Sequence, residues 1–227
     1  MEYHIGIEDV EPNNWVAFIF EWPGCCSRGR TRQDALSSVS SAIEEMRSRL
    51  KDTKVDTSAH QSPYTIKIAE EYQSFKSSPD YIVNAFFEND KIPLNQSDLV
   101  YAKTIFDLNR KELLEVISNL SDEDLDRPVD GEVQGDIRHI VKHIGTAEWW
   151  YWDRLNLAFP REQRPDDDIF KLLDTIRKFT LENLPRLVGS DQQTCRSEEF
   201  WSPRKLLRRA VWHERVHTMQ IKRYLDI

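Results

Sequence analysis

Residues 201–217 read WSPRKLLRRAVWHERVH. Ser202 followed by Pro203 is typical of a helix N-terminus, because a serine side chain caps free N–H groups and proline fits the first helical position. Apolar residues then recur at helical spacing, which predicts one long helix from Pro203 to the chain end. His213 and His217 are four residues apart, so their rings share one face of this helix.

A second histidine pair has the same spacing. His139 and His143 lie in a segment, residues 133–157, whose periodicity predicts another helix. One such pair alone is more often a surface or hydrogen-bonded feature, but two pairs on separate helices indicate a shared metal site. Two ligands from the last helix and one from the earlier helix would leave coordination positions open to water or substrate, as in catalytic metal centres.

The last helix also matches the His-Glu-x-x-His signature of zinc proteases, with Glu214 in the place of the general base. Such enzymes usually have a third ligand well downstream of the motif. The acidic candidate after His217 is Asp226, which lies on the same predicted helix. The protease interpretation is therefore disfavoured, and we expect the third ligand to come from upstream.

The remaining C-terminal sequence is also helical in pattern. Apolar stripes run through residues 97–120, 133–157 and 168–187. Together with the last helix they predict four helices of similar length, for which an antiparallel arrangement is the simplest packing. The sequence thus predicts an all-α antiparallel four-helix bundle over residues 97–227.

The N-terminal sequence differs from the rest. Alternating or apolar runs at residues 3–7, 15–21 and 25–27 predict three strands. Thr31 begins a capping box, and an apolar stripe continues from there to about Leu50. A further strand is expected at residues 64–68. We therefore predict an α+β domain over residues 1–70, made of three strands, a helix and a strand, and a linker over residues 71–96.

The C-terminal part resembles the DinB-like family. The resemblance is carried by HIGTAEWW at residues 143–150, WSPRKL at 201–206 and WHERVH at 212–217, in this order. It implies a four-helix fold and a metal triad of His143, His213 and His217, with His139 as a fourth ligand or a neighbouring group. It also implies thiol-dependent transferase or isomerase chemistry with a low-molecular-weight thiol.

The N-terminal part resembles the HicB-like antitoxin domain. The matching sequences are WVAF at residues 15–18, WPGC at 22–25 and GRT at 29–31. The resemblance covers about residues 1–70 and implies a degenerate RNase H-like fold that docks a protein partner. No separate DNA-binding segment accompanies it, so a docking or structural module is the favoured interpretation.

Composition limits the partners. The formal net charge is −8 and the sequence pI about 5.3, which argues against nucleic acid as a ligand. We find neither an apolar run long enough for a membrane span nor a secretory leader, which predicts a soluble cytoplasmic protein with no membrane partner. The three cysteines form no disulfide or zinc-knuckle pattern, so we expect free thiols.

Two functions remain open. The first is a metal-dependent thiol S-transferase or isomerase, in which zinc or nickel activates a bound thiol that attacks a small electrophile. The second is a non-catalytic binding protein with a structural or vestigial metal, closed by a fourth ligand such as His139, and an N-terminal module that docks a partner. Exposed tryptophans on the helices would favour a homodimer.

Several charged residues have two interpretations. Glu148 would either orient a metal ligand or form an exposed salt bridge, and Glu214 is expected to pair with a basic side chain. The basic residues near the start of the last helix would form a solvated face or hold the carboxylates of a thiol cofactor. We favour the solvated face; its members are Arg204, Lys205, Arg208 and Arg209.

Overall fold

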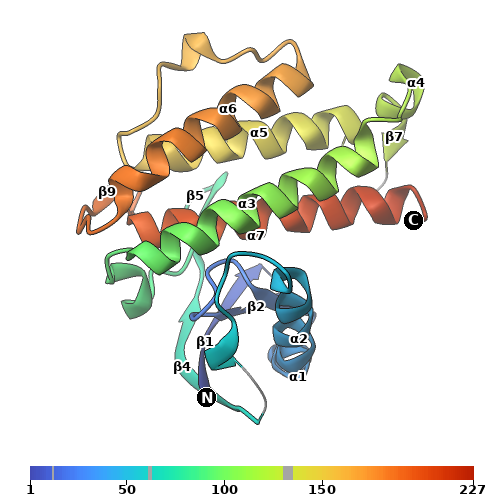
Figure 1. The fold of residues 1–227 in the computed structure, drawn as a ribbon. Coiled ribbons are helices and arrows are strands. Elements are labelled where there is room, and N and C mark those ends of the chain that lie inside the picture. Colours follow the sequence, from blue (N-terminus) through green and yellow to red (C-terminus); the bar gives the residue numbers. More distant parts are fainter. Residues whose placement is uncertain (12, 61–62, 130–134) are drawn as a thin grey trace.

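A mixed sheet forms one layer of the molecule, and long helices lie against it (Figure 1). This is a computed structural model that describes residues 1–11, 13–60, 63–129 and 135–227. The strands are β1 (Glu2–Glu11), β2 (Asn14–Ile19), β3 (Cys26–Gly29) and β4 (Thr65–Gln73), in the order β3-β2-β1-β4. β1 pairs antiparallel with β2 and parallel with β4.

Both faces of the central strands are buried. One face, which includes Ile5 and Ile19, packs against α1 (Arg32–Ser37) and α2 (Val39–Leu50). On the other face, Phe18 packs against the indole ring of Trp212 on α7 (Pro203–Tyr224), with ring centroids 6.2 Å apart. A strand that is covered on both sides needs a nearly continuous apolar run, and β2 has one.

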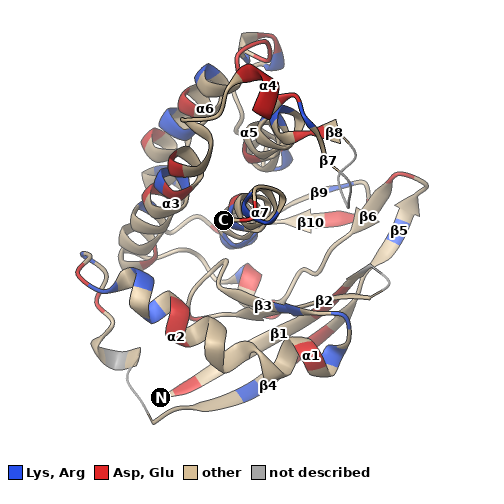
Figure 2. Cartoon of the chain, turned by 90° about the vertical axis from the view of Figure 1, so that its right-hand side faces the viewer, with Lys and Arg blue, Asp and Glu red and all other residues tan. Residues whose placement is uncertain are grey.

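Four long helices lie over the sheet (Figure 2). They are α3 (Gln96–Ile117), α5 (Ile137–Arg154), α6 (Ile169–Asn183) and α7. α7 contacts both α3 and α5, and α5 also contacts α6. A short α4 (Asp122–Leu125) follows α3, and single 3-10 turns are formed by Ser58–His60, Glu88–Lys91, Arg161–Gln163 and Leu184–Leu187.

Small antiparallel ladders lie between the helices. β5 (Phe75–Ser78) pairs with β6 (Tyr81–Val83), and β9 (Thr194–Arg196) pairs with β10 (Glu199–Trp201) just before α7. β7 (Pro128–Val129) pairs with β8 (Gly135–Asp136) before α5. The predicted linker over residues 71–96 therefore contains a hairpin and a 3-10 turn.

The predicted fold class, an α+β domain followed by an all-α antiparallel four-helix bundle, is wrong. The chain is mixed α/β, with helices spread along it and strands between the long helices. One hydrophobic core includes Ile5 and Ile43 from the N-terminal part together with Tyr101 and Leu207 from the helices. Sequence patterns show which side of an element is apolar but not what covers it, so they do not reveal a core that both parts share. The boundaries at residues 70 and 97 stay predictions.

The N-terminal part and α7 approach each other closely at Gly24. Its φ of +87° is a backbone conformation that glycine adopts readily, and a Cβ placed there would lie 2.4 Å from a methyl carbon of Val211 on α7. The predicted helix from Thr31 to Leu50 is divided at Ser38, which caps the C-terminus of α1 and precedes α2. The predicted helix start at Val133 lies outside the described residues.

None of the helices in the described ranges is both long and apolar enough to cross a bilayer.

Candidate metal centre

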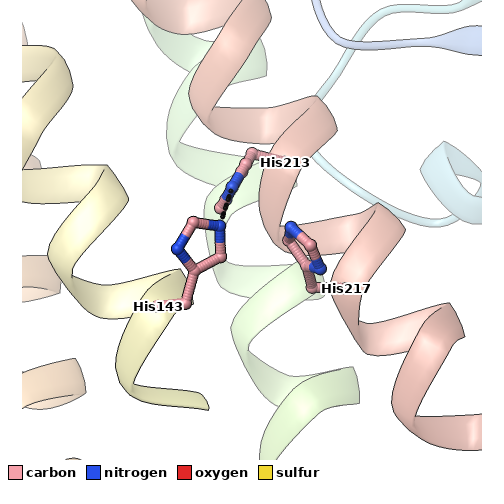
Figure 3. Close-up of side chains that lie close together, drawn as sticks. All are labelled: His143, His213 and His217. Atoms are coloured by element: carbon pink, nitrogen blue, oxygen red, sulfur yellow. Dashed lines mark hydrogen bonds between the residues drawn. The ribbon is translucent and has the colours of Figure 1, made fainter. Parts of the chain in front are cut away.

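Three histidine rings converge between α5 and α7 (Figure 3). His143 comes from the middle of α5, and His213 and His217 lie one turn apart on α7. Their candidate ligand nitrogens all lie within 4.8 Å of one another. Within the described part of the chain, this is the one group of three or more histidine, cysteine or acidic side chains with metal-binding spacing.

The ends of both helices are fixed by the sequence. The Ser202 hydroxyl accepts a hydrogen bond from the Lys205 amide, and Pro203 occupies the first turn of α7, as predicted. The Asp136 carboxylate accepts one from the His139 amide at 2.7 Å and so caps α5. These caps fix where each helix begins and therefore which residues face the other helix.

A buried ion-pair network holds the helices together beside the site. Glu148 on α5 and Glu214 on α7 both pair with Arg110 of α3 and with Arg177 of α6. The four N···O distances lie between 2.6 and 3.0 Å, and all four side chains are almost completely buried. We call these four residues the tetrad. Glu214 directly follows His213 on α7, so the tetrad restrains the helix that carries two of the three histidines.

His143 and His213 stay neutral at physiological pH. Burial lowers the pKa of His143 to about 4, and the neighbouring His217 and His139 add to this effect. Burial also lowers the pKa of His213 well below its ordinary value, again helped by His217 and His143. A neutral imidazole has the free lone pair that a metal ion requires, so these shifts favour metal binding near neutral pH.

Gln220 orients the ring of His217. The Gln220 carbonyl oxygen lies 2.7 Å from His217 Nδ1, and the Gln220 amide nitrogen donates to the Tyr224 hydroxyl at 3.0 Å. Since that oxygen can only accept, Nδ1 carries the proton and Nε2 carries the lone pair. A hydrogen bond of this kind behind a ligand ring is typical of histidine metal sites.

The donor spacing fits a shared divalent ion. Two imidazole nitrogens bound at about 2.1 Å lie roughly 3.0 to 3.4 Å apart for bond angles between a right angle and a tetrahedral one. The Nε2 atoms of His143 and His213 are 2.9 Å apart, just below this range. The ring centroid of His217 lies 4.9 Å from that of His143 and 4.4 Å from that of His213.

A cavity of about 690 Å³ opens beside the three rings. Its wall includes all three histidines, the aromatic rings of Trp149, Trp150, Tyr151 and Trp212, and the guanidinium groups of Arg28, Arg161, Arg164 and Arg209. None of the three cysteines, which are all free thiols, is part of this wall. The volume is in the range of small-molecule binding sites.

The other predicted site residues are placed elsewhere. His139 is exposed in the first turn of α5 and does not belong to the three-histidine group. Glu148 neither contacts a histidine nor forms an exposed salt bridge, so both interpretations of it were wrong. Glu214 pairs with basic side chains, as predicted, and is therefore turned away from the base position of a protease.

The solvated face predicted at the start of the last helix was also wrong. Arg204, Lys205, Arg208 and Arg209 are between 0% and 7% exposed. Three of them pair with carboxylates: Arg204 with Asp98, Lys205 with Glu199 and Arg208 with Asp90, at 2.6 to 2.7 Å. A run of basic residues is usually solvated, and its acidic partners here lie on other elements, where no local pattern shows them.

Sequence reasoning also missed Gln220 and the cavity. Gln220 is three residues after His217, a spacing that places the two side chains side by side on a helix, so this signal was present. The cavity wall combines residues of the sheet with residues of α5 and α7, which only the tertiary structure brings together. No protein-family model, curated protein or solved structure matches the chain.

Proposed function

We propose that the chain binds a divalent metal ion through His143, His213 and His217 and uses it in a thiol-dependent transferase or isomerase reaction. The observation that carries this proposal is the open cavity beside three converging imidazole rings. The resemblance of residues 97–227 to the DinB-like family supports the same ligands and the thiol chemistry. Imidazole nitrogen suits both zinc and nickel.

The absence of a fourth ligand among the described residues favours a catalytic over a structural role. Structural metal sites are usually closed by four protein ligands, whereas catalytic sites keep a position for water or substrate. His139, the expected fourth ligand of a closed site, is exposed and outside the group. The cavity borders the three histidines directly, which would give a ligand access to the open position.

The nucleophile in this proposal comes from a bound small molecule. When bound, a divalent ion lowers the pKa of a thiol or water, so that the anion is available near neutral pH. Because no cysteine of the chain lines the cavity, the chain itself supplies no thiol there. The four aromatic side chains of the wall would hold the apolar parts of the thiol and the electrophile and exclude water.

Tyr151 is the candidate proton donor. Its side chain lies in the cavity wall, and its ring centroid is 5.9 Å from that of His213. Burial raises the pKa of Tyr151 to about 12, so its hydroxyl keeps its proton at neutral pH. A protonated hydroxyl in the cavity wall can donate a hydrogen bond to negative charge that develops on the electrophile.

We place the protein in the cytoplasm, because three free thiols without a disulfide are typical of a reducing compartment.

The test is turnover by the metal-loaded protein. Zinc- and nickel-loaded wild type is assayed with a panel of small thiols and electrophiles, beside His213→Ala and the control His139→Ala. We expect turnover in the wild type and the control and none in His213→Ala. Lack of turnover by fully loaded wild type across the panel would contradict an enzymatic role, and activity of His213→Ala would contradict the site.

A further inference from the structure

The cavity beside the histidines is strongly cationic in an acidic protein. The chain has a formal net charge of −8, yet the described cavity wall contains four arginines and no aspartate or glutamate. Two of these arginines have polar partners: Arg28 donates to Asn14, and Arg164 pairs with Asp166. A cavity of this charge attracts anions and repels cations.

Arg209 differs from the other buried cations of α7. It is 7% exposed and lines the cavity, whereas the three neighbouring basic residues each pair with a carboxylate. No carboxylate pairs with Arg209 among the described side chains, and its Nε and Nη1 atoms are buried without a hydrogen-bond partner. Its guanidinium carbon lies 4.3 Å from the ring centroid of Trp212, a contact that attracts the charge but satisfies neither N–H group.

An uncompensated buried guanidinium carries a large desolvation penalty. Its fork of parallel N–H donors matches the two oxygens of a carboxylate, which would remove that penalty when a ligand enters. Arg209 precedes His213 by four residues, so it lies one turn of α7 away from the metal position. A helix rises about 6 Å over four residues, which is the distance along α7 between the backbone positions of Arg209 and His213.

We infer that the cavity takes a small carboxylate-bearing thiol, whose carboxylate binds Arg209 while its sulfur occupies the open metal position. The inference rests on the proposed metal function for the sulfur contact. The carboxylate contact is made by Arg209 and does not require the metal. We expect a short spacer of about two to four carbon atoms between sulfur and carboxylate, because Arg209 and His213 lie one helical turn apart.

The test compares two thiols that differ in charge. Binding of 3-mercaptopropionate and of neutral 3-mercapto-1-propanol to zinc-loaded protein is measured by titration calorimetry. Hydrogen bonds to charged groups are strong enough that we expect the wild type to prefer the carboxylate by about tenfold or more. Arg209→Gln should lose this preference and keep its zinc content and its affinity for the neutral thiol. Equal binding of both thiols by the wild type would overturn the inference.

Two further variants separate Arg209 from the general charge of the cavity. Arg161→Gln removes a cavity arginine that is exposed to solvent, and it should keep most of the preference. Arg209→Lys keeps the charge without the planar fork and should keep only part of it. An equal loss in Arg161→Gln and Arg209→Gln would overturn the role of Arg209, as would full preference in either Arg209 variant. Arg209→Lys also answers the question if Arg209→Gln does not fold.

A metal-free arm separates the inference from the proposed function. Binding of propionate to metal-free protein is followed by ligand-observed NMR for wild type and Arg209→Lys. If the protein binds no zinc but propionate binding still depends on Arg209, the metal proposal fails and the carboxylate site stands. If zinc binds but propionate binding is the same in both proteins, the carboxylate site fails and the metal proposal stands.

Discussion

The tetrad and the cavity beside the histidines both include buried charged residues of α7, but they differ in how these charges are compensated. In the tetrad, Glu148 and Glu214 share Arg110 and Arg177, and every carboxylate has two cationic partners. In the cavity, whose described wall contains no aspartate or glutamate, Arg209 pairs with no carboxylate among the described side chains. Compensated charge is complete without a ligand and holds helices in place, whereas uncompensated charge marks where a ligand would bind.

The largest effect is expected from breaking the tetrad. Arg177→Met leaves two buried carboxylates with Arg110 as their remaining cation. Removing one partner of a buried ion pair typically lowers the free energy of unfolding by about 3 to 5 kcal/mol, because the remaining charge stays buried. Urea unfolding of the metal-free protein measures this change.

The control for this experiment is Lys111→Gln, which removes an exposed cation that pairs with Glu115. Its unfolding midpoint should match that of the wild type. If Arg177→Met unfolds at the same urea concentration as this control, the tetrad does not hold the helices together.

Acid should weaken the stabilisation that the tetrad gives the folded protein. Burial acts to raise the pKa of Glu148, but the charges of Arg177 and Arg110 outweigh burial and hold it well below its ordinary value. The folded state therefore binds this proton less readily than the unfolded state, so the stabilisation is complete above the unfolded pKa of about 4.5 and decreases as the pH falls further.

Chemical unfolding between pH 6 and pH 3 measures this dependence, because this interval extends from above to below the unfolded pKa of about 4.5. The wild type should lose stability below about pH 4.5, and Glu148→Gln should lose less over the same interval. Parallel pH profiles for the two proteins would show that Glu148 is not held in its charged form by the arginines.

A smaller effect, on metal affinity, is expected from removing the hydrogen bond between Gln220 and His217. Gln220→Met removes the carbonyl oxygen that accepts from His217 Nδ1 and fixes the ring. Loss of such a hydrogen bond usually weakens metal affinity by about 10- to 100-fold. Competition with a chelator of known affinity measures it, with His139→Ala as a control of unchanged affinity. Unaltered affinity in Gln220→Met would mean that the ring of His217 does not depend on Gln220.

Local features of this fold were predictable, whereas the partners of its buried charges were not. The Ser202-Pro203 start of α7 and the capping box at Thr31 follow from contacts within one turn, so the sequence contains all the information. The helical spacing of His213 and His217 is local in the same way. Which face of α5 meets α7 depends on packing across the whole molecule, so sequence left His139 and His143 as alternatives.

The same distinction explains the errors. The tetrad joins residues of four helices, and the partners of Arg204 and Arg208 lie more than a hundred positions upstream. No periodicity connects such residues, and arginine is usually exposed, so a solvated face was the natural interpretation. The fold class failed for a related reason, because α7 covers the sheet with residues whose apolar pattern would suit packing on another helix equally well.

We propose that the three histidines bind one divalent ion, and metal analysis tests this most directly. Purified protein without an affinity tag is stripped with a chelator, loaded with zinc or nickel, dialysed and analysed for metal by mass spectrometry. We predict about one ion per chain in the wild type and in His139→Ala and almost none in His213→Ala or His217→Ala. Equal metal content in the wild type and His213→Ala, or no bound metal in the wild type, would contradict the claim.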